Sequence, residues 1–235
     1  MHTFREYLLG NFCFVSGLEK RGFELDLVDG EYENNLNFRK VISASIYATL
    51  HLTPWNSTAF RCKLIISSID VIDCFRQYNL FLDQPEISDG CAYDVLATDL
   101  LWLKWNENPD SALKHKSDYI LDDGQGFQRM FSDLDSVGAL FLDDINSQRK
   151  LADFLISLEE YPRRIKWGGE PKSSDPFIFA CALYLSIGDK EDAIRALNFG
   201  LKKYGLSEHK VEWEEYRLER FQERRNILIG EMGEN

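Results

Sequence analysis

Neighbouring aspartates are the residues of this chain whose types and spacing could most directly support catalysis. Three such pairs occur, Asp122 with Asp123, Asp133 with Asp135, and Asp143 with Asp144. Two carboxylates can act as acid and nucleophile in a glycosidase, or hold two metal ions in a nuclease. Residues one or two apart on a helix do not face each other, however, and acidic turns and helix caps explain such pairs more simply. A hydrolase or nuclease that uses carboxylates stays open as an alternative function.

Other signatures of catalysis or cofactor binding do not occur in the sequence. It has no C-x-x-C, H-x-x-x-H or H-E-x-x-H motif, and its four histidines lie far apart. The glycines at 123–126 and 168–169 lack the spacing and the lysine of a phosphate-binding loop, and no G-x-S-x-G motif occurs. We therefore expect no metal, no cofactor and no enzymatic activity.

The acidic charge of the chain is concentrated in one segment. Residues 83–144 hold 14 Asp and Glu against 4 Lys and Arg, which is −10 of the net charge of −12. Such a segment repels nucleic acid and anionic membranes and attracts basic proteins. We predict a basic protein partner, without nucleic-acid or membrane binding. The simpler alternative is an acidic loop region that only keeps the protein soluble.

Aromatic residues accompany this acidic segment. If residues 100–105 formed an edge strand, two tryptophans there would be aromatic anchors in an acidic field, which suits a protein interface. The candidate partner-binding residues are Asp94, Asp99, Trp102, Trp105, Asp122, Asp123, Asp143 and Asp144.

The composition favours a globular protein of the cytoplasm. Hydrophobic residues make up 44% of the chain, and none of its apolar runs approaches the ~20 residues that span a bilayer. The five cysteines are scattered and odd in number, which suits reduced thiols better than a disulfide framework. The N-terminus has no basic segment ahead of an apolar one, so we expect no secretion signal. The oligomeric state stays open.

Strand patterns dominate the first part of the chain. Thr3 can cap a helix that runs to residue 20, although Gly10 argues against its continuity. Alternation of apolar and polar residues predicts strands over 23–28, 41–52 and 60–69, the last two forming an antiparallel hairpin. Pro54 is expected to end the second strand.

Helical patterns dominate the second part. Asp70 is predicted to cap a helix to residue 82, and residues 100–105 to form a strand, with a helix as the alternative. Ser147 can cap a helix, and two antiparallel helices are predicted over 176–204 around Gly188. From Gln125 the period is helical again, with apolar residues at three- and four-residue steps, namely Phe127, Met130, Phe131, Leu134, Val137, Leu140 and Phe141.

This order of elements predicts an α+β fold, with an antiparallel sheet packed with helices, then a C-terminal helical hairpin and a last helix. Turn-forming residues make 161–175 a connector. It would join an α+β domain at 1–160 to a helical subdomain at 176–230 that packs on it.

Residues 176–205 resemble one tetratricopeptide repeat. The matching residues are Phe177, Tyr184, Gly188, Ala193, Leu197 and Gly200, whereas Gly205 replaces the usual proline and Ala180-Cys181 the usual leucine and glycine. The pattern does not recur 34 residues before or after, and a solenoid needs about three repeats to bury its faces. The hairpin is therefore expected to support the rest of the fold rather than to form a peptide groove.

Residues 3–160 resemble a set of uncharacterised bacterial α+β domains. The resemblance is carried by the "KRGF" phrase after the first helix and by Asp133, Leu134, Val137, Gly138, Phe141, Leu142, Leu151, Phe154 and Leu155. Such domains often accompany polymorphic toxins, which implies an immunity protein that binds a cognate toxin. With the acidic segment, this predicts an immunity protein that covers a basic toxin domain. An adaptor that docks a partner helix on its helical tail is a further alternative.

Overall fold

The computed structural model describes residues 3–26, 35–56, 59–78, 92–107, 119–120, 125–158, 176–205, 219 and 222–230. Several predicted features lie outside these ranges: the end of the 23–28 strand, the end of the helix to residue 82, the connector at 161–175 and the start of the last helix. The predicted domain boundaries stay a prediction.

The fold is α+β, as predicted, with a six-stranded antiparallel sheet and helices. The strands are β1 (Glu24–Asp26), β2 (Leu36–Val41), β3 (Ile46–Asn56), β4 (Ala59–Ser68), β5 (Tyr93–Asp99) and β6 (Tyr119–Ile120). The helices are α1 (Phe4–Gly10), α2 (Phe12–Glu19), α3 (Ile69–Gln77), α4 (Leu100–Glu107), α6 (Gly126–Asp133), the π-helical turn η1 (Leu134–Gly138), α7 (Ala139–Asp144), α8 (Gln148–Ser157), α9 (Pro176–Ser186) and α10 (Lys190–Gly205).

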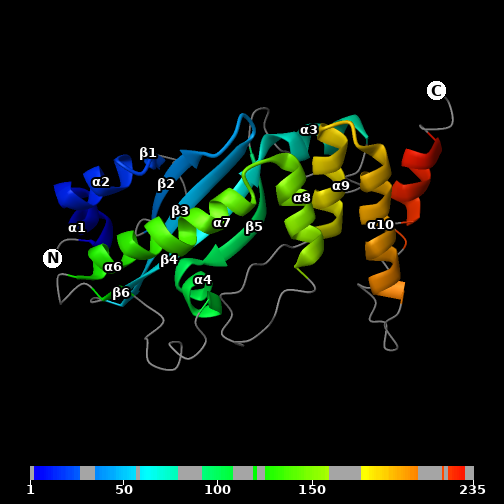
Figure 1. Cartoon of the computed structure of the whole chain (residues 1–235). Helices are drawn as coiled ribbons and strands as arrows, with labels where there is room; N and C mark the ends of the chain where they lie inside the picture. The colour runs from blue at the N-terminus through cyan, green and yellow to red at the C-terminus, as the bar shows by residue number, and fades with distance from the viewer. Residues whose placement is uncertain are drawn as a thin grey trace. The chain divides into compact units, whose positions relative to one another are not determined.

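The sheet order is β1-β2-β3-β4-β5, and β6 pairs with β4 (Figure 1). On β3 the predicted alternation holds from Ile46 onward, where every second side chain is buried: Ile46, Ala48, Leu50 and Leu52. The prediction that segments 41–52 and 60–69 form neighbouring strands is confirmed, because β3 and β4 are adjacent in the sheet. Burial of one apolar face against helices is the main stabilising contribution of such a sheet.

The predicted limits of the second strand are wrong at both ends. Val41 ends β2, and the backbone N–H groups of Ile42 and Ser43 donate to the carbonyl oxygen of Ile46, so residues 42–45 form a turn. At the other end β3 continues through Pro54. Proline removes a ladder donor, but β2 pairs with β3 only as far as Leu52, so Pro54 interrupts no bond of that ladder in the described chain.

Residues 93–107 combine the two alternatives that the pattern left open. Residues 93–99 form β5, and residues 100–105, predicted as a strand, are helical in α4. The change occurs at Asp99, whose Oδ1 accepts a hydrogen bond from the Leu101 N–H at 2.9 Å and so satisfies a donor at the helix start. An acidic residue after an apolar strand was the available signal for this switch.

The helix starts were predicted with mixed success. Thr3 forms a capping box with Glu6, Asn11 separates α1 from α2 next to Gly10, and Ser147 caps α8. Ser68, not Asp70, is the cap position of α3, and Asp70 lies in the first turn, where a carboxylate is also favourable.

The chain forms two compact units. The first contains α1, α2, β1–β4, α4, β6, α6, η1, α7 and the end of β5; the second contains α3, α8, α9, α10 and the start of β5. In the second unit α9 is buried from Pro176 to Leu185 and packs against α3, α8 and α10.

The predicted helical hairpin around Gly188 is confirmed. Gly188 has a φ of 76°, a left-handed conformation that glycine adopts without a steric penalty, and it joins α9 to α10. Arg149 of α8 forms ion pairs with Asp189 and Asp192, which lie at the start of α10. The hairpin is thus one part of a packed helical layer.

Candidate interaction surface

The helical segments α6, η1 and α7 lie end to end along the strands of the first unit (Figure 1). The middle turn, Leu134–Gly138, is a π-helix. Such turns are rare, usually hold one extra residue within an α-helix, and often occur at functional sites. Each residue after the turn takes the place that the preceding residue would have in a continuous α-helix.

A buried carboxylate holds the helix just before the π turn. Asp133 is only 3% exposed, and its Oδ1 accepts a hydrogen bond from Lys104 Nζ of α4 at 2.7 Å. Its Oδ2 accepts one from the Tyr119 hydroxyl of β6 at 3.0 Å. Because both oxygens have partners, Asp133 is better suited to anchoring α6 than to acting as a catalytic base.

Two buried side chains that can lose a proton, Tyr119 and Cys62, interact electrostatically with Asp133. Burial raises the pKa of the Tyr119 hydroxyl well above its ordinary value, and the negative charge of Asp133 raises it further. Burial also raises the pKa of the Cys62 thiol on β4, with the charges of Asp99 and Asp133 as smaller causes. The neutral forms are therefore strongly favoured in the fold, so Cys62 is not a ready nucleophile at neutral pH.

These pKa values predict a loss of stability at alkaline pH. The pKa values of Tyr119 and Cys62 are higher in the folded than in the unfolded state, so the neutral side chains stabilise the fold fully below about pH 9–10. This stabilisation is lost as the pH rises toward the folded-state pKa. Each group then lowers the free energy of unfolding by up to about 1.4 kcal/mol per pH unit. We expect Tyr119→Phe to reduce this slope between pH 9 and 11, as measured by urea denaturation. Equal pH slopes for Tyr119→Phe and the unchanged protein would show that ionisation of Tyr119 does not cause the loss of stability.

A second carboxylate is held inside the π turn. Arg21, which follows α2, donates from Nε to Asp135 Oδ1 at 2.6 Å and from Nη2 to Oδ2 at 2.5 Å. The close approach of α2 to α6 depends on Gly17, since a Cβ there would lie 2.6 Å from Cζ of Phe131. The N-terminal side of the turn is thus fixed to both α2 and α4.

Glycine packing holds the C-terminal side of the turn. A Cβ on Gly138 would lie 3.1 Å from Leu100 Cδ1 and 3.1 Å from Leu134 Cδ1, which is tighter than most Cβ contacts, so these leucines would have to shift. Phe141 and Leu142 of α7 are buried. Leu140 belongs to the apolar residues that recur at helical spacing, yet it is exposed, because the π turn interrupts the α-helical period before it.

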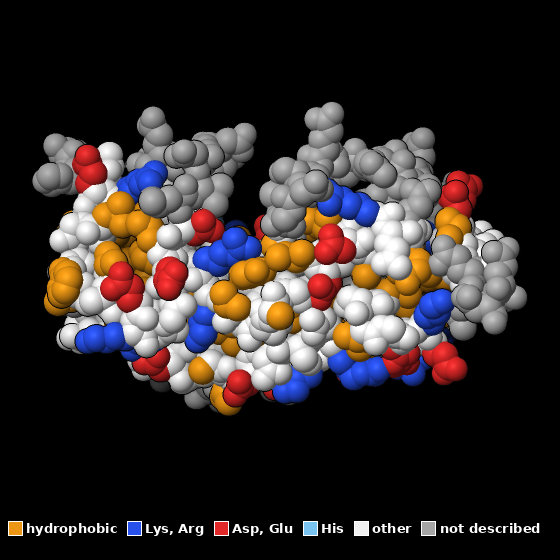
Figure 2. Space-filling model, turned by 90° about the horizontal axis from the view of Figure 1, so that it is seen from above, with side chains coloured by type: hydrophobic (Ala, Val, Ile, Leu, Met, Phe, Trp, Pro, Cys, Tyr) orange, Lys and Arg blue, Asp and Glu red, His pale blue; other side chains and the backbone are white. Residues whose placement is uncertain are grey.

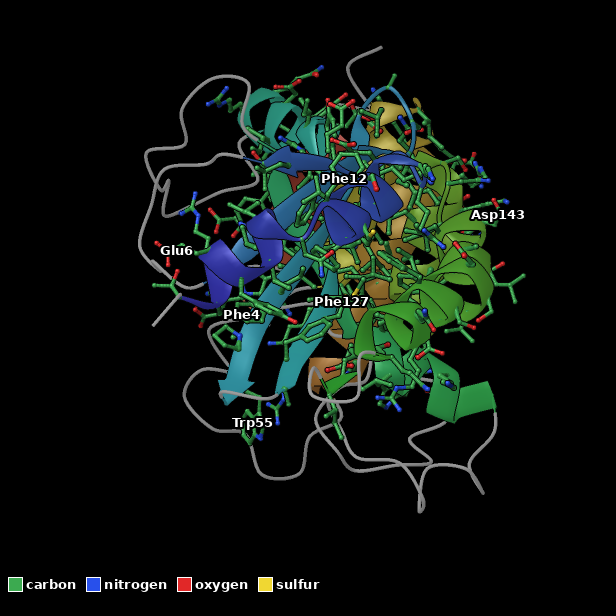
Figure 3. All side chains as sticks on the ribbon, turned by 90° about the vertical axis from the view of Figure 1, so that its left-hand side faces the viewer. Phe4, Glu6, Phe12, Trp55, Phe127 and Asp143 are labelled. Carbon is green, nitrogen blue, oxygen red and sulfur yellow. The ribbon has the colours of Figure 1, made fainter. Side chains whose placement is uncertain are left out.

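The exposed side chains of α7 include a leucine and two aspartates. Leu140 is 59% exposed, and Asp143 and Asp144, one turn later, are exposed as well. Figure 3 shows Asp143 on the outside of the helix and Phe127 between α6 and the strands. We call Leu140, Asp143 and Asp144 the α7 face. A leucine beside carboxylates suits contact with an apolar surface that carries basic residues.

Of the other predicted partner-binding residues, the two that the structure describes in the first unit, Asp99 and Trp102, are not part of this face. Asp94 is exposed on β5, and Asp99 caps α4. Trp102 is 2% exposed, so it packs in the core because residues 100–105 are helical rather than an edge strand. The Trp105 side chain, Asp122 and Asp123 lie outside the described residues. Sequence reasoning missed Leu140, and only the π turn would have identified it.

Among the described residues, no group of three or more His, Cys, Asp or Glu side chains could hold a metal ion. None of the described helices has the length and apolar character that crossing a membrane requires. In the view of Figure 2, acidic, basic and apolar side chains are interspersed, so a continuous acidic surface is not seen there.

Comparison of the chain with protein-family models, curated proteins and solved structures gives no significant match.

Proposed function

We propose that the protein is a cytoplasmic immunity protein that binds a cognate bacterial toxin and covers a basic surface of it, with the α7 face as the contact. The observation that supports this mode is the exposure of Leu140 beside carboxylates by a rare helical turn. The resemblance of residues 3–160 to immunity-type domains supports the class of partner.

The chemistry of the face indicates how binding would work. Asp143 and Asp144 would attract a basic toxin surface and speed the encounter, because charges of this kind act mainly on association rate. Leu140 would then be buried at the contact, and burial of one leucine contributes about 2 kcal/mol. The predicted carboxylates Asp122 and Asp123 would add to the same attraction if they adjoin this face.

The test joins binding to biological effect. A basic protein that co-purifies with the chain from the organism encoding it should inhibit growth when expressed alone, and co-expression of the chain should restore growth. The double reversal Asp143→Lys with Asp144→Lys should abolish protection and slow association, with a deficit that shrinks near 0.5 M salt because screening is strong there.

The matched control variant reverses two acidic residues outside the α7 face. Glu24 on β1 and Asp73 on α3 are exposed, and their double reversal to lysine alters the net charge by the same amount. This variant should protect as the unchanged protein does. Equal protection by both variants would show that the α7 face is not the contact and would remove the basis of the proposal.

A further inference from the structure

The exposure of Leu140 depends on the rotation of α7 about its axis. In a continuous α-helix without the extra residue of the π turn, each residue of α7 would occupy the place that its successor has now. Leu140 would take the buried place of Phe141, and Leu142 would take the exposed place of Asp143. The sequence is apolar at both 140 and 142, so its composition alone permits either rotation.

The packing around residue 138 selects between the two rotations. In the continuous helix, Val137 would enter the place of Gly138, where a Cβ already lies 3.1 Å from Leu100 Cδ1. That place therefore accepts glycine and resists valine. On the N-terminal side, the bonds of the buried Asp133 carboxylate to Lys104 and Tyr119 oppose a compensating rotation of α6.

We infer that Gly138 is a positioning residue that, together with the π turn, turns Leu140 and Asp144 outward and makes the α7 face available for a partner. This inference rests on the proposed function only for the identity of what binds. The rotation itself can be measured on the protein alone, so the two can fail separately.

The test moves the glycine by one residue. Exchanging the two side chains, Val137→Gly with Gly138→Val, keeps the composition but allows the continuous α-helix. Leu140→Cys and Leu142→Cys, introduced separately, place reporter thiols whose exposure is measured by maleimide labelling and peptide mass spectrometry. Exposed Cys13 and buried Cys62 are internal references for fast and slow labelling.

The expected result is an exchange between the two reporter thiols. In the unchanged background the thiol at position 140 should label about as fast as Cys13, and the thiol at position 142 about as slowly as Cys62. In the exchanged background the reporter at 140 should become slow and the reporter at 142 fast. General destabilisation would instead speed labelling at Cys62 and at both reporters, and so does not imitate a rotation.

A deletion is the matched control. Removing Ser136, an exposed residue of the π turn, takes out the extra residue and leaves Val137 and the residues after it in their present places. The reporter at 140 should stay fast and the reporter at 142 slow. If the exchanged variant does not fold, this deletion decides the matter, since slow labelling at position 140 in it would overturn the inference. A fast reporter at 140 and a slow one at 142 in a folded exchanged variant would overturn it as well.

If the rotation changes as expected, partner binding gives a second result. The exchanged variant should lose toxin protection and the Ser136 deletion should keep it. Rotation without any effect on protection would leave the positioning role of Gly138 intact and contradict the proposed function instead.

Discussion

Changing Leu140 to serine is expected to weaken binding of the toxin partner about 30-fold or more, while leaving the free energy of unfolding within about 0.5 kcal/mol of its original value. Leu140 is already 59% exposed, so its removal leaves no cavity. In a complex, an apolar side chain at the centre of the contact loses its water and becomes one of the few residues on which affinity depends. The effect should appear mainly in the dissociation rate.

The matched control is Val41→Ser. Val41 is also apolar and 64% exposed, but it lies at the end of β2 rather than on α7. Calorimetric titration with the purified partner, with thermal unfolding as the stability measurement, separates the two positions. Equal affinities for the Leu140 variant and the unchanged protein would show that the exposed leucine has no part in recognition.

The antiparallel hairpin and the C-terminal helical hairpin could be predicted because their signals are local. The alternation from Ile46 to Leu52 repeats at every second residue, and the strand has one buried face to satisfy it. Gly188 lies between two helical periods where a left-handed residue is needed. In both cases the nearest neighbours in sequence determine the local structure.

The strand limits could not be predicted from the same signals. Ile42 and Ala44 continue the apolar alternation of β3, yet they lie in the turn before it, where the backbone bonds to Ile46. Turn formation there depends on the pairing of Val41 with Tyr47, a tertiary choice of register. A pattern of period two does not distinguish a strand from a strand preceded by a tight turn.

The α7 face could not be predicted because a π-helical turn gives no clear signal in the spacing of apolar residues along the sequence. The apolar residues from Phe127 to Phe141, Leu140 among them, recur at the spacing of an uninterrupted α-helix. What overrides this period is close packing at Gly138 and the fixed carboxylates of Asp133 and Asp135. The contacts of Asp133 with Lys104 of α4 and of Asp135 with Arg21, which follows α2, join residues 29 and 114 positions apart in the sequence.

Removing Lys104 is expected to produce the largest loss of stability among the changes to the helix anchor. Lys104→Met leaves the buried carboxylate of Asp133 bonded to the Tyr119 hydroxyl but without a positive charge at its other oxygen. Breaking a fully buried ion pair costs about 3–5 kcal/mol. Since Lys104 is 40% exposed and water reaches its end of the pair, we expect about 2–3 kcal/mol by urea denaturation at pH 7.

A second substitution tests whether the buried charge is the cause. Asp133→Asn in the Lys104→Met background removes that charge and keeps an amide oxygen that can accept from Tyr119, so the double variant should be more stable than Lys104→Met alone. Lys63→Met, at an exposed lysine of β4, should change stability by no more than about 0.5 kcal/mol. A double variant less stable than Lys104→Met would mean that lost packing of the lysine stem, rather than an unpaired carboxylate beside the π turn, sets the cost.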